Sequence, residues 1–231
     1  MAEPPLDADA VLRAFSGEVP VFPLPSLVLL PDTIVPLLIF EDRYRRMVAD
    51  ALEGERLIAM ALLKPGWETQ YNAAPAFHER VCVGSIVNHE RLADGRFKLL
   101  LYGLFRAEVV EETQAAPYRK VRVLVLPDEV RDDAARQIDE RLHQALDRIP
   151  GRRGRVGRIR QIAQQVRGPS GGVGRLADAV AEAAELEPEE RYQVLAETDV
   201  LRRLDIVLEV LEKKARSGPL LLPPRVDPTL N

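Results

Sequence analysis

Residues 19–44 read VPVFPLPSLVLLPDTIVPLLIFEDRY, an apolar stretch with prolines at positions 20, 23, 25, 31 and 36. Proline lacks the backbone N–H that a helix interior or a sheet ladder requires, so this spacing excludes a helix before position 36. The same spacing predicts extended chain, broken into short edge strands and bends. The stretch therefore indicates a β-rich beginning in which some strand edges stay unpaired.

The residues that follow predict one helix and then a buried strand. From Glu41 onward, apolar residues recur at the spacing of a helix that buries one face. They are Phe40, Tyr44, Met47, Val48, Ala51 and Leu52. Gly54 stands where this helix should end. Residues 56–63 (RLIAMALL) then form an apolar run of strand length, and a loop with several aromatic residues comes next.

The rest of the chain divides into a β-rich part and a helical part. Asp94-Gly95 predicts a hairpin between two strands, because both residues accept the positive φ of a tight turn. After Asp128 the apolar period is helical, with Pro188 suited to a first helical position and Asp199 suited to a cap. We therefore predict an α+β protein with a flexible arm or one short helix at 1–17, a β-rich subdomain at 18–128, a helical subdomain at 129–216 and a proline-rich tail at 217–231.

The composition excludes several classes of protein. The 231 residues contain 36 acidic and 32 basic side chains, and the net charge of −4 offers no general attraction to nucleic acid or anionic membranes. The one cysteine, Cys82, excludes an internal disulfide and agrees with a reducing compartment. The first residues do not read as a secretory signal, and no apolar run is long enough to cross a bilayer. We expect a cytoplasmic protein.

A series of short motifs runs through the chain in a recognisable order. The first are Val21-Phe22-Pro23-Leu24, Val28-Leu29-Leu30-Pro31, Pro36-Leu37 and Ile39-Phe40-Glu41-Asp42-Arg43-Tyr44. The later ones are Val83-Gly84, Asp94-Gly95-Arg96, Gly103, Phe105-Arg106, Pro117-Tyr118, Leu176-Ala177-Asp178 and Arg203-Leu204. Together they resemble the Lon protease N-terminal domain family over residues 19–216. The sequence departs from that pattern at Asp32, Tyr192 and Ala196, where the family favours glycine, glutamine and glutamate.

The resemblance implies a PUA-like β-barrel or sheet that carries one helix, followed by an all-helical subdomain. In the full protease this module recognises unfolded or tagged substrates, while the ATPase and the Ser–Lys protease domains lie elsewhere. No phosphate-binding GxxxxGK[ST] loop occurs here, and the length leaves little room for those domains. We therefore expect a non-enzymatic protein without cofactors that binds unfolded or apolar polypeptide. An ATP-dependent protease is the expected partner, which would make the protein a proteolysis adaptor; the oligomeric state stays open.

The sequence offers no convincing catalytic or metal-binding site. Ser170, in the sequence GPSG, resembles the serine motif of the Lon proteolytic site, and Lys213 follows at a suggestive distance. A serine nucleophile needs a preorganised base and oxyanion donors, whereas this glycine-rich segment reads as a linker between helices. The histidines at 78, 89 and 143 are scattered and show no metal-ligand spacing.

A cluster of arginines suggests an alternative function. It contains Arg148, Arg152, Arg153, Arg155, Arg158 and Arg160, with no acidic residue among them. Such a basic loop on a PUA-like fold would let Arg152, Arg153, Arg155 and Arg158 contact RNA or an acidic partner. No aromatic residue interleaves to stack on bases, so a solvated linker is the favoured interpretation and nucleic acid is an unlikely partner.

Apolar residues near bends and loops are the better candidates for a binding site. The expected peptide-binding residues are Leu27, Leu29, Leu30, Trp67, Tyr71 and Phe77. A peptide groove needs apolar pockets beside an accessible strand edge, and the prolines nearby leave such edges unpaired. The alternative is that the leucines belong to the core and the aromatic residues pack over the barrel. The apolar tail segment Leu220–Pro224 is suited to dock on the protein's own groove or on a neighbour.

Overall fold

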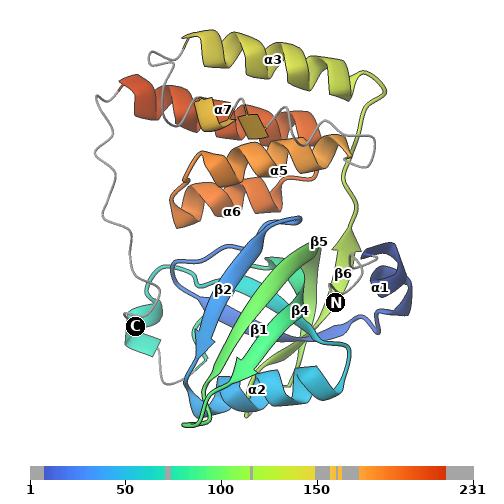
Figure 1. The fold of residues 1–231 in the computed structure, drawn as a ribbon, viewed down its shortest axis with the longest axis vertical. Coiled ribbons are helices and arrows are strands. Elements are labelled where there is room, and N and C mark those ends of the chain that lie inside the picture. Colours follow the sequence, from blue (N-terminus) through green and yellow to red (C-terminus); the bar gives the residue numbers. More distant parts are fainter. Residues whose placement is uncertain are drawn as a thin grey trace.

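The computed structural model describes residues 8–70, 74–114, 117–148, 157–159, 161–162 and 172–216, in which a β-barrel lies against a layer of helices (Figure 1). The strands are β1 (Glu18–Leu24), β2 (Ile34–Ile39), β3 (Leu57–Leu62), β4 (Arg80–Arg91), β5 (Phe97–Gln114) and β6 (Lys120–Leu126). The helices are α1 (Ala8–Ala14), α2 (Asp42–Glu53), the 3-10 turn η1 (Trp67–Gln70), α3 (Ala134–Arg148), α5 (Val173–Ala183), α6 (Pro188–Ala196) and α7 (Val200–Arg216). The predicted α+β class is confirmed.

Five of these strands close into a barrel, and β2 stays outside the closed ring. The strand order is β2-β5-β4-β3-β1-β6, and a further pairing of β6 with β5 joins the ends. β5 serves both neighbours because it is 18 residues long. Its first part, Phe97–Tyr102, pairs with β2, and its second part, Arg106–Gln114, pairs with β6. One edge of β2 is therefore without a strand partner in the described part of the chain.

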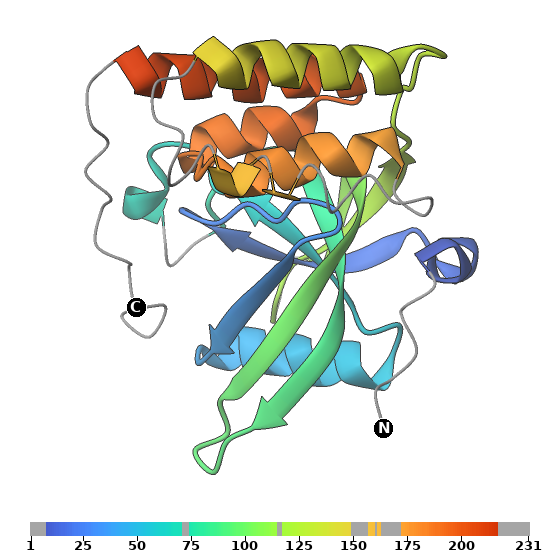
Figure 2. The same ribbon diagram turned by 45° about the horizontal axis from the view of Figure 1, so that its top comes forward.

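The local predictions along the barrel hold because they rest on local chemistry. The predicted helix after Glu41 is α2, which buries Tyr44, Met47, Val48 and Ala51 and ends at Gly54. β3 is buried at all six positions, as its continuous apolar run indicates. At the predicted hairpin Gly95 has φ +84°, and the Asp94 carboxylate accepts a hydrogen bond from the Arg96 N–H at 3.1 Å. Figure 2 shows this long β4–β5 hairpin projecting beyond the barrel.

The helical layer is built around α7, which contacts α3, α5 and α6. Pro188 begins α6 behind a capping box formed by Glu187 and Glu190. Asp199 caps α7, since its Oδ1 accepts hydrogen bonds from the N–H groups of Leu201 and Arg202 at 2.9 and 3.2 Å. Both helix starts were predicted from the sequence.

The apolar period is helical from just after Asp128, but the first helix of this part, α3, starts only at Ala134. The reason lies in Glu129, whose backbone forms a parallel bridge with Asp199. The Glu129 N–H donates to the Thr198 carbonyl at 2.9 Å, and its own carbonyl accepts from Val200 at 3.2 Å. These long-range hydrogen bonds hold the chain extended where local periodicity favours a helix.

Charged side chains form a buried junction between the barrel and the helices. Arg106 on β5 and Arg203 on α7 are 3% and 0% exposed, and both donate to Asp178 on α5. Arg203 also bonds to Asp128, which follows β6, at 2.5 Å. Because a buried charge is costly unless it is paired, this cluster favours one arrangement of the two layers.

Candidate functional site

The free edge of β2 is the most conspicuous unsatisfied feature of the barrel. Thr33, just before the strand, accepts a hydrogen bond from the Gly103 N–H of β5 at 2.9 Å. Backbone groups alternate in direction along a strand, so those of Ile34, Pro36 and Leu38 point away from β5, toward the open side. Pro36 has no N–H to offer. The edge thus presents three carbonyl acceptors and two N–H donors.

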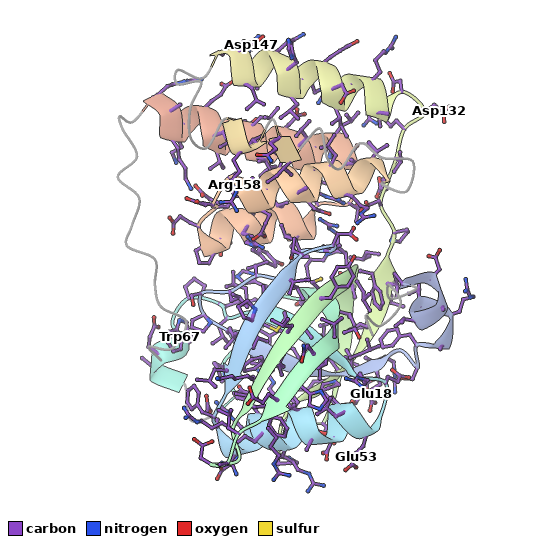
Figure 3. All side chains as sticks on the ribbon, viewed as in Figure 1. Glu18, Glu53, Trp67, Asp132, Asp147 and Arg158 are labelled. Carbon is purple, nitrogen blue, oxygen red and sulfur yellow. The ribbon has the colours of Figure 1, made fainter. Side chains whose placement is uncertain are left out.

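A groove of about 610 Å³ runs beside this edge. We name it the β2 groove; its lining residues are Phe22, Pro23, Leu24, Pro25, Ser26, Leu27, Pro36, Leu37, Leu38, Ile39, Phe40, Glu41, Arg43, Tyr44, Leu63, Trp67, Glu68 and Pro75. They come from β1, the bend after it, β2, the start of α2, the residue after β3, η1 and the segment before β4. Figure 3 shows Trp67 on η1, at the flank of the barrel.

The opposite face of β2 carries a second apolar hollow, of about 360 Å³. It is lined by Pro36, Leu37, Leu38, Asn88, Glu90, Lys98, Leu99 and Leu100. Pro36, Leu37 and Leu38 line both hollows, so the strand lies between them. Large apolar side chains are exposed around it: Ile34 is 54%, Phe40 44% and Leu100 37% accessible. Contiguous exposed apolar surface of this kind marks interaction sites.

Few charges border the β2 groove, and two of them pair with each other. Arg43 and Glu41 form an ion pair at 2.9 Å, and the Arg43 guanidinium lies 4.6 Å from the centre of the Tyr44 ring. The groove is therefore mainly apolar, with a strand edge as its polar component. Such a surface can recognise polypeptide by backbone hydrogen bonds and apolar side chains.

Helix α6 supports two walls of the groove from behind. Arg191 donates to the Val28 carbonyl at 2.6 Å, next to the wall residue Leu27. Near the other wall, His78 donates its backbone N–H to the Leu62 carbonyl at 2.8 Å, next to the wall residue Leu63. The His78 ring lies 4.1 Å from that of Tyr192, and its Nε2 lies 3.7 Å from the Glu189 carboxylate. The walls are thus positioned by the helical layer as well as by the barrel.

The structure separates the predicted peptide-binding residues into three groups. Leu27 and Trp67 are half-buried and line the β2 groove, as a binding role would require. Leu29 and Leu30 are fully buried in the core, so the expectation that they face a ligand is wrong. Phe77 is also excluded, because it is 8% exposed and the Arg119 guanidinium covers its ring at 4.3 Å.

Other predicted residues fall outside the described part of the chain. These are Tyr71, Arg152, Arg153, Arg155 and Ser170. Arg158 is described and exposed on a helical segment, and the RNA-binding alternative remains a prediction from the sequence. Among the residues that the structure describes, no three His, Cys, Asp or Glu side chains could hold a metal ion. None of the described helices has the length and hydrophobicity needed to span a membrane.

Sequence reasoning missed the residues of β2 itself. Pro36, Leu38, Phe40 and Leu100 border the two hollows, yet none was singled out as a binding residue. A signal was present in the sequence. Pro36 indicates an edge strand, and residues 34–39 are apolar on both faces of that strand. Only one face of such a strand packs on the barrel, so the apolar side chains of the other face stay exposed.

Comparison with known proteins agrees with this geometry. The family model of the ATP-dependent protease La (LON) substrate-binding domain matches residues 18–213. The chain is 29% identical over 205 residues to a Lon protease of Dictyoglomus thermophilum and 24% identical over 204 residues to Lon protease 2 of Myxococcus xanthus. These matches cover 84% of this chain but only 25% and 23% of the relatives. The chain thus spans about a quarter of the length of the curated relatives it matches.

Solved structures show the same fold. The N-terminal domain of the Mycobacterium avium complex Lon protease superimposes with a TM-score of 0.64 at 20% identity, covering 84% of this chain and 98% of that one. A Lon N-terminal domain protein from Xanthomonas campestris gives a TM-score of 0.58 at 22% identity, covering 83% of this chain and 97% of that one. The described barrel and helical layer therefore form a known type of domain.

Proposed function

Because the chain belongs to the Lon substrate-binding domain family, we propose that it binds apolar segments of unfolded polypeptide along the free edge of β2. The observation that carries this proposal is an edge strand with an apolar hollow on each face. An extended segment added to this edge would place alternate side chains toward the two hollows, because successive side chains of a strand point to opposite faces. Its backbone would bond to the carbonyls of Ile34, Pro36 and Leu38.

This mode of binding suits polypeptides of varied sequence. Backbone hydrogen bonds recognise any extended segment, and wide apolar hollows accept many side chains. Pro36 removes one donor from the edge, which limits pairing with other edge strands and hence aggregation. The expected ligand is therefore an unfolded segment with apolar residues at successive positions, and a folded sheet edge is disfavoured.

We also propose that the protein is not an enzyme and acts in the cytoplasm as an adaptor that brings bound polypeptide to an ATP-dependent protease of the Lon type. The match to a substrate-binding domain supports this role. The mainly apolar lining of the β2 groove also supports it. Of the two carboxylates in that lining, Glu41 forms an ion pair with Arg43. Binding without cleavage is what such an adaptor requires.

The test is a titration of the full chain with a fluorescently labelled unfolded polypeptide, followed by anisotropy. The double variant Phe40→Ser/Trp67→Ala removes two apolar side chains of the β2 groove and should weaken binding at least about tenfold, since each apolar contact contributes on the order of 1 kcal/mol. Leu124→Ser is the matched control, because Leu124 is 58% exposed on β6 and does not line the groove. Equal affinity of all three proteins, or no saturable binding, would reject the proposal.

A further inference from the structure

We propose that the chain's own tail, residues 217–231, docks its Leu220–Pro224 segment in the β2 groove and competes there with foreign polypeptide. This inference rests on the function proposed above and adds its regulation. The tail reads SGPLLLPPRVDPTLN and lies outside the described residues. The groove is mainly apolar, and its size suits an extended segment of a few residues.

The end of α7 lies close enough to the groove for the tail to reach. Lys214, in the last turn of α7, contacts the Glu190 carboxylate of α6 at 3.0 Å. The neighbouring Glu189 lies 3.7 Å from His78, three residues beyond the groove residue Pro75. Helix α6, about 10–12 Å across with its side chains, thus lies between the last turn of α7 and the start of β4. Both views place the end of α7 and the η1 turn on the same side of the molecule (Figures 1 and 2).

The four steps from Arg216 to Leu220 span about 13–14 Å when extended, which is enough to pass one helix diameter before the docked segment begins. Prolines at 219, 223 and 224 favour that extended conformation in the free tail, so docking costs less conformational entropy than for an ordinary segment. Apolar extended segments rich in proline bind grooves lined by aromatic residues and prolines. The accessible aromatic residues and prolines of the β2 groove are Phe40, Trp67, Pro25 and Pro36.

The leucines of the tail match the polar part of the groove as well. In an extended segment alternate N–H groups point the same way, so those of Leu220 and Leu222 could donate to two of the three carbonyls on the free edge of β2. Pro223 and Pro224 have no N–H to donate, so the rest of the contact is apolar. Tethering raises the local concentration of the tail to the millimolar range, so a contact with a Kd of about 0.1 mM would keep the groove about 90% occupied.

The test uses Trp67, the only tryptophan of the chain, as a reporter in the groove. The full chain is compared with a chain ending at Arg216, which retains every described residue. Loss of the tail should make Trp67 at least about twofold more sensitive to acrylamide quenching. A synthetic peptide of residues 217–231 should reverse this change saturably. The variant Leu220→Ser/Leu221→Ser/Leu222→Ser should behave like the shortened chain, and the peptide with the same changes should have no effect.

Binding of foreign polypeptide separates this inference from the proposed function. The shortened chain should bind labelled unfolded polypeptide at least about tenfold more tightly than the full chain. Identical quenching and affinity with and without the tail would overturn the inference and leave the proposed function standing. If the tail peptide protects Trp67 but not even the shortened chain binds foreign polypeptide, docking of the tail stands, while the proposed function and the competition both fail. Protection that depends on protein concentration would assign the groove to the tail of a second copy and overturn the intramolecular form.

Discussion

Arg106 on β5 donates hydrogen bonds to both carboxylate oxygens of Asp178 on α5, with Nη1–Oδ2 at 3.0 Å and Nη2–Oδ1 at 2.5 Å. The two side chains are 3% and 2% exposed, so this bidentate pair connects the barrel to the helical layer in a largely water-free environment. Arg106 also donates to the Leu195 carbonyl at the end of α6, at 3.1 Å. One barrel residue therefore positions two helices, and α6 in turn supports the walls of the β2 groove.

Asp178→Asn should lower the free energy of unfolding by about 3–5 kcal/mol, because it leaves buried guanidinium groups without their main anion. Urea denaturation followed by circular dichroism measures the change. Glu111→Gln is the matched control: it removes the partner of Arg122, but both side chains of that pair are more than half exposed. An exposed pair contributes little, so the control should change stability by less than about 1 kcal/mol. Equal effects of the two variants would contradict a structural role for the junction.

Gly103→Ala should destabilise the protein by about 1–3 kcal/mol through overpacking. A Cβ at this position would lie 2.2 Å from the Leu30 carbonyl oxygen, and a backbone atom cannot move away cheaply. Thermal unfolding compares this variant with Gly172→Ala, whose Cβ would meet nothing within 4 Å and whose φ of −58° and ψ of 155° suit any residue. The control should shift stability by less than about 1 kcal/mol. If Gly103→Ala left stability unchanged, the bend at residues 30–32, which lies against Gly103, would have to be loosely packed.

The features that could be predicted from the sequence depend on local chemistry. Pro36 indicates an edge strand because it lacks an N–H, and Asp94-Gly95 indicates a hairpin because both residues tolerate the turn conformation. The departure at Asp32 is equally informative. Asp32 has φ +60°, a left-handed conformation that favours glycine, the residue that the family resemblance leads one to expect at this position. Its side chain accepts a hydrogen bond from the Tyr102 hydroxyl at 2.6 Å.

The features that could not be predicted depend on residues far apart in the chain. Leu29 and Leu30 lie between prolines like an exposed loop, yet the helical layer fixes this segment, with Arg175 of α5 contacting Asp32 at 3.1 Å. Arg106 and Asp178 are separated by 72 positions, and nothing in the period of β5 indicates that an arginine there is buried. The candidate site was therefore found in part: its proline-marked edge could be predicted, and its exact wall residues could not.

Stability should fall as the pH rises from about 10 to about 12, because Tyr102 must ionise. Burial, and then the hydrogen bond to Asp32 at 2.6 Å, raises the pKa of Tyr102 to about 12. A pKa that is higher in the folded state than in the unfolded chain stabilises the fold fully below the unfolded value of 10.0 and progressively less above it. Burial, and then the hydrogen bond to Asp50, raises the pKa of Tyr118 to about 12. Its ionisation should therefore also lower stability over this pH range.

Asp32→Asn should lower the pKa of Tyr102 toward 10 without reaching it, since the amide removes the negative charge and burial remains. Nuclear magnetic resonance of isotope-labelled tyrosines follows each ring during a pH titration. Tyr118 is the internal control, because its partner is Asp50 and its pKa should stay unchanged in the variant. A shift of both tyrosines would point to a general loosening of the barrel, and a shift of neither would contradict the role of Asp32.

Cys82 should react with a thiol reagent at least roughly 1,000-fold more slowly in the native protein than in urea, the factor expected when reaction requires global unfolding of a domain. Its side chain is fully buried, and burial raises the pKa of the thiol, so the reactive thiolate is scarce. The control is Leu124→Cys in a Cys82→Ala background, which places the thiol at an exposed position and should label rapidly. The prediction also tests the bend, because a Cβ at Gly103 would lie 3.2 Å from the Cys82 sulfur. Gly103→Ala could accelerate labelling of Cys82 by more than its loss of global stability accounts for. The bend at residues 30–32 would then open locally, without global unfolding. Rapid labelling of Cys82 in the unmodified protein would contradict the closed barrel.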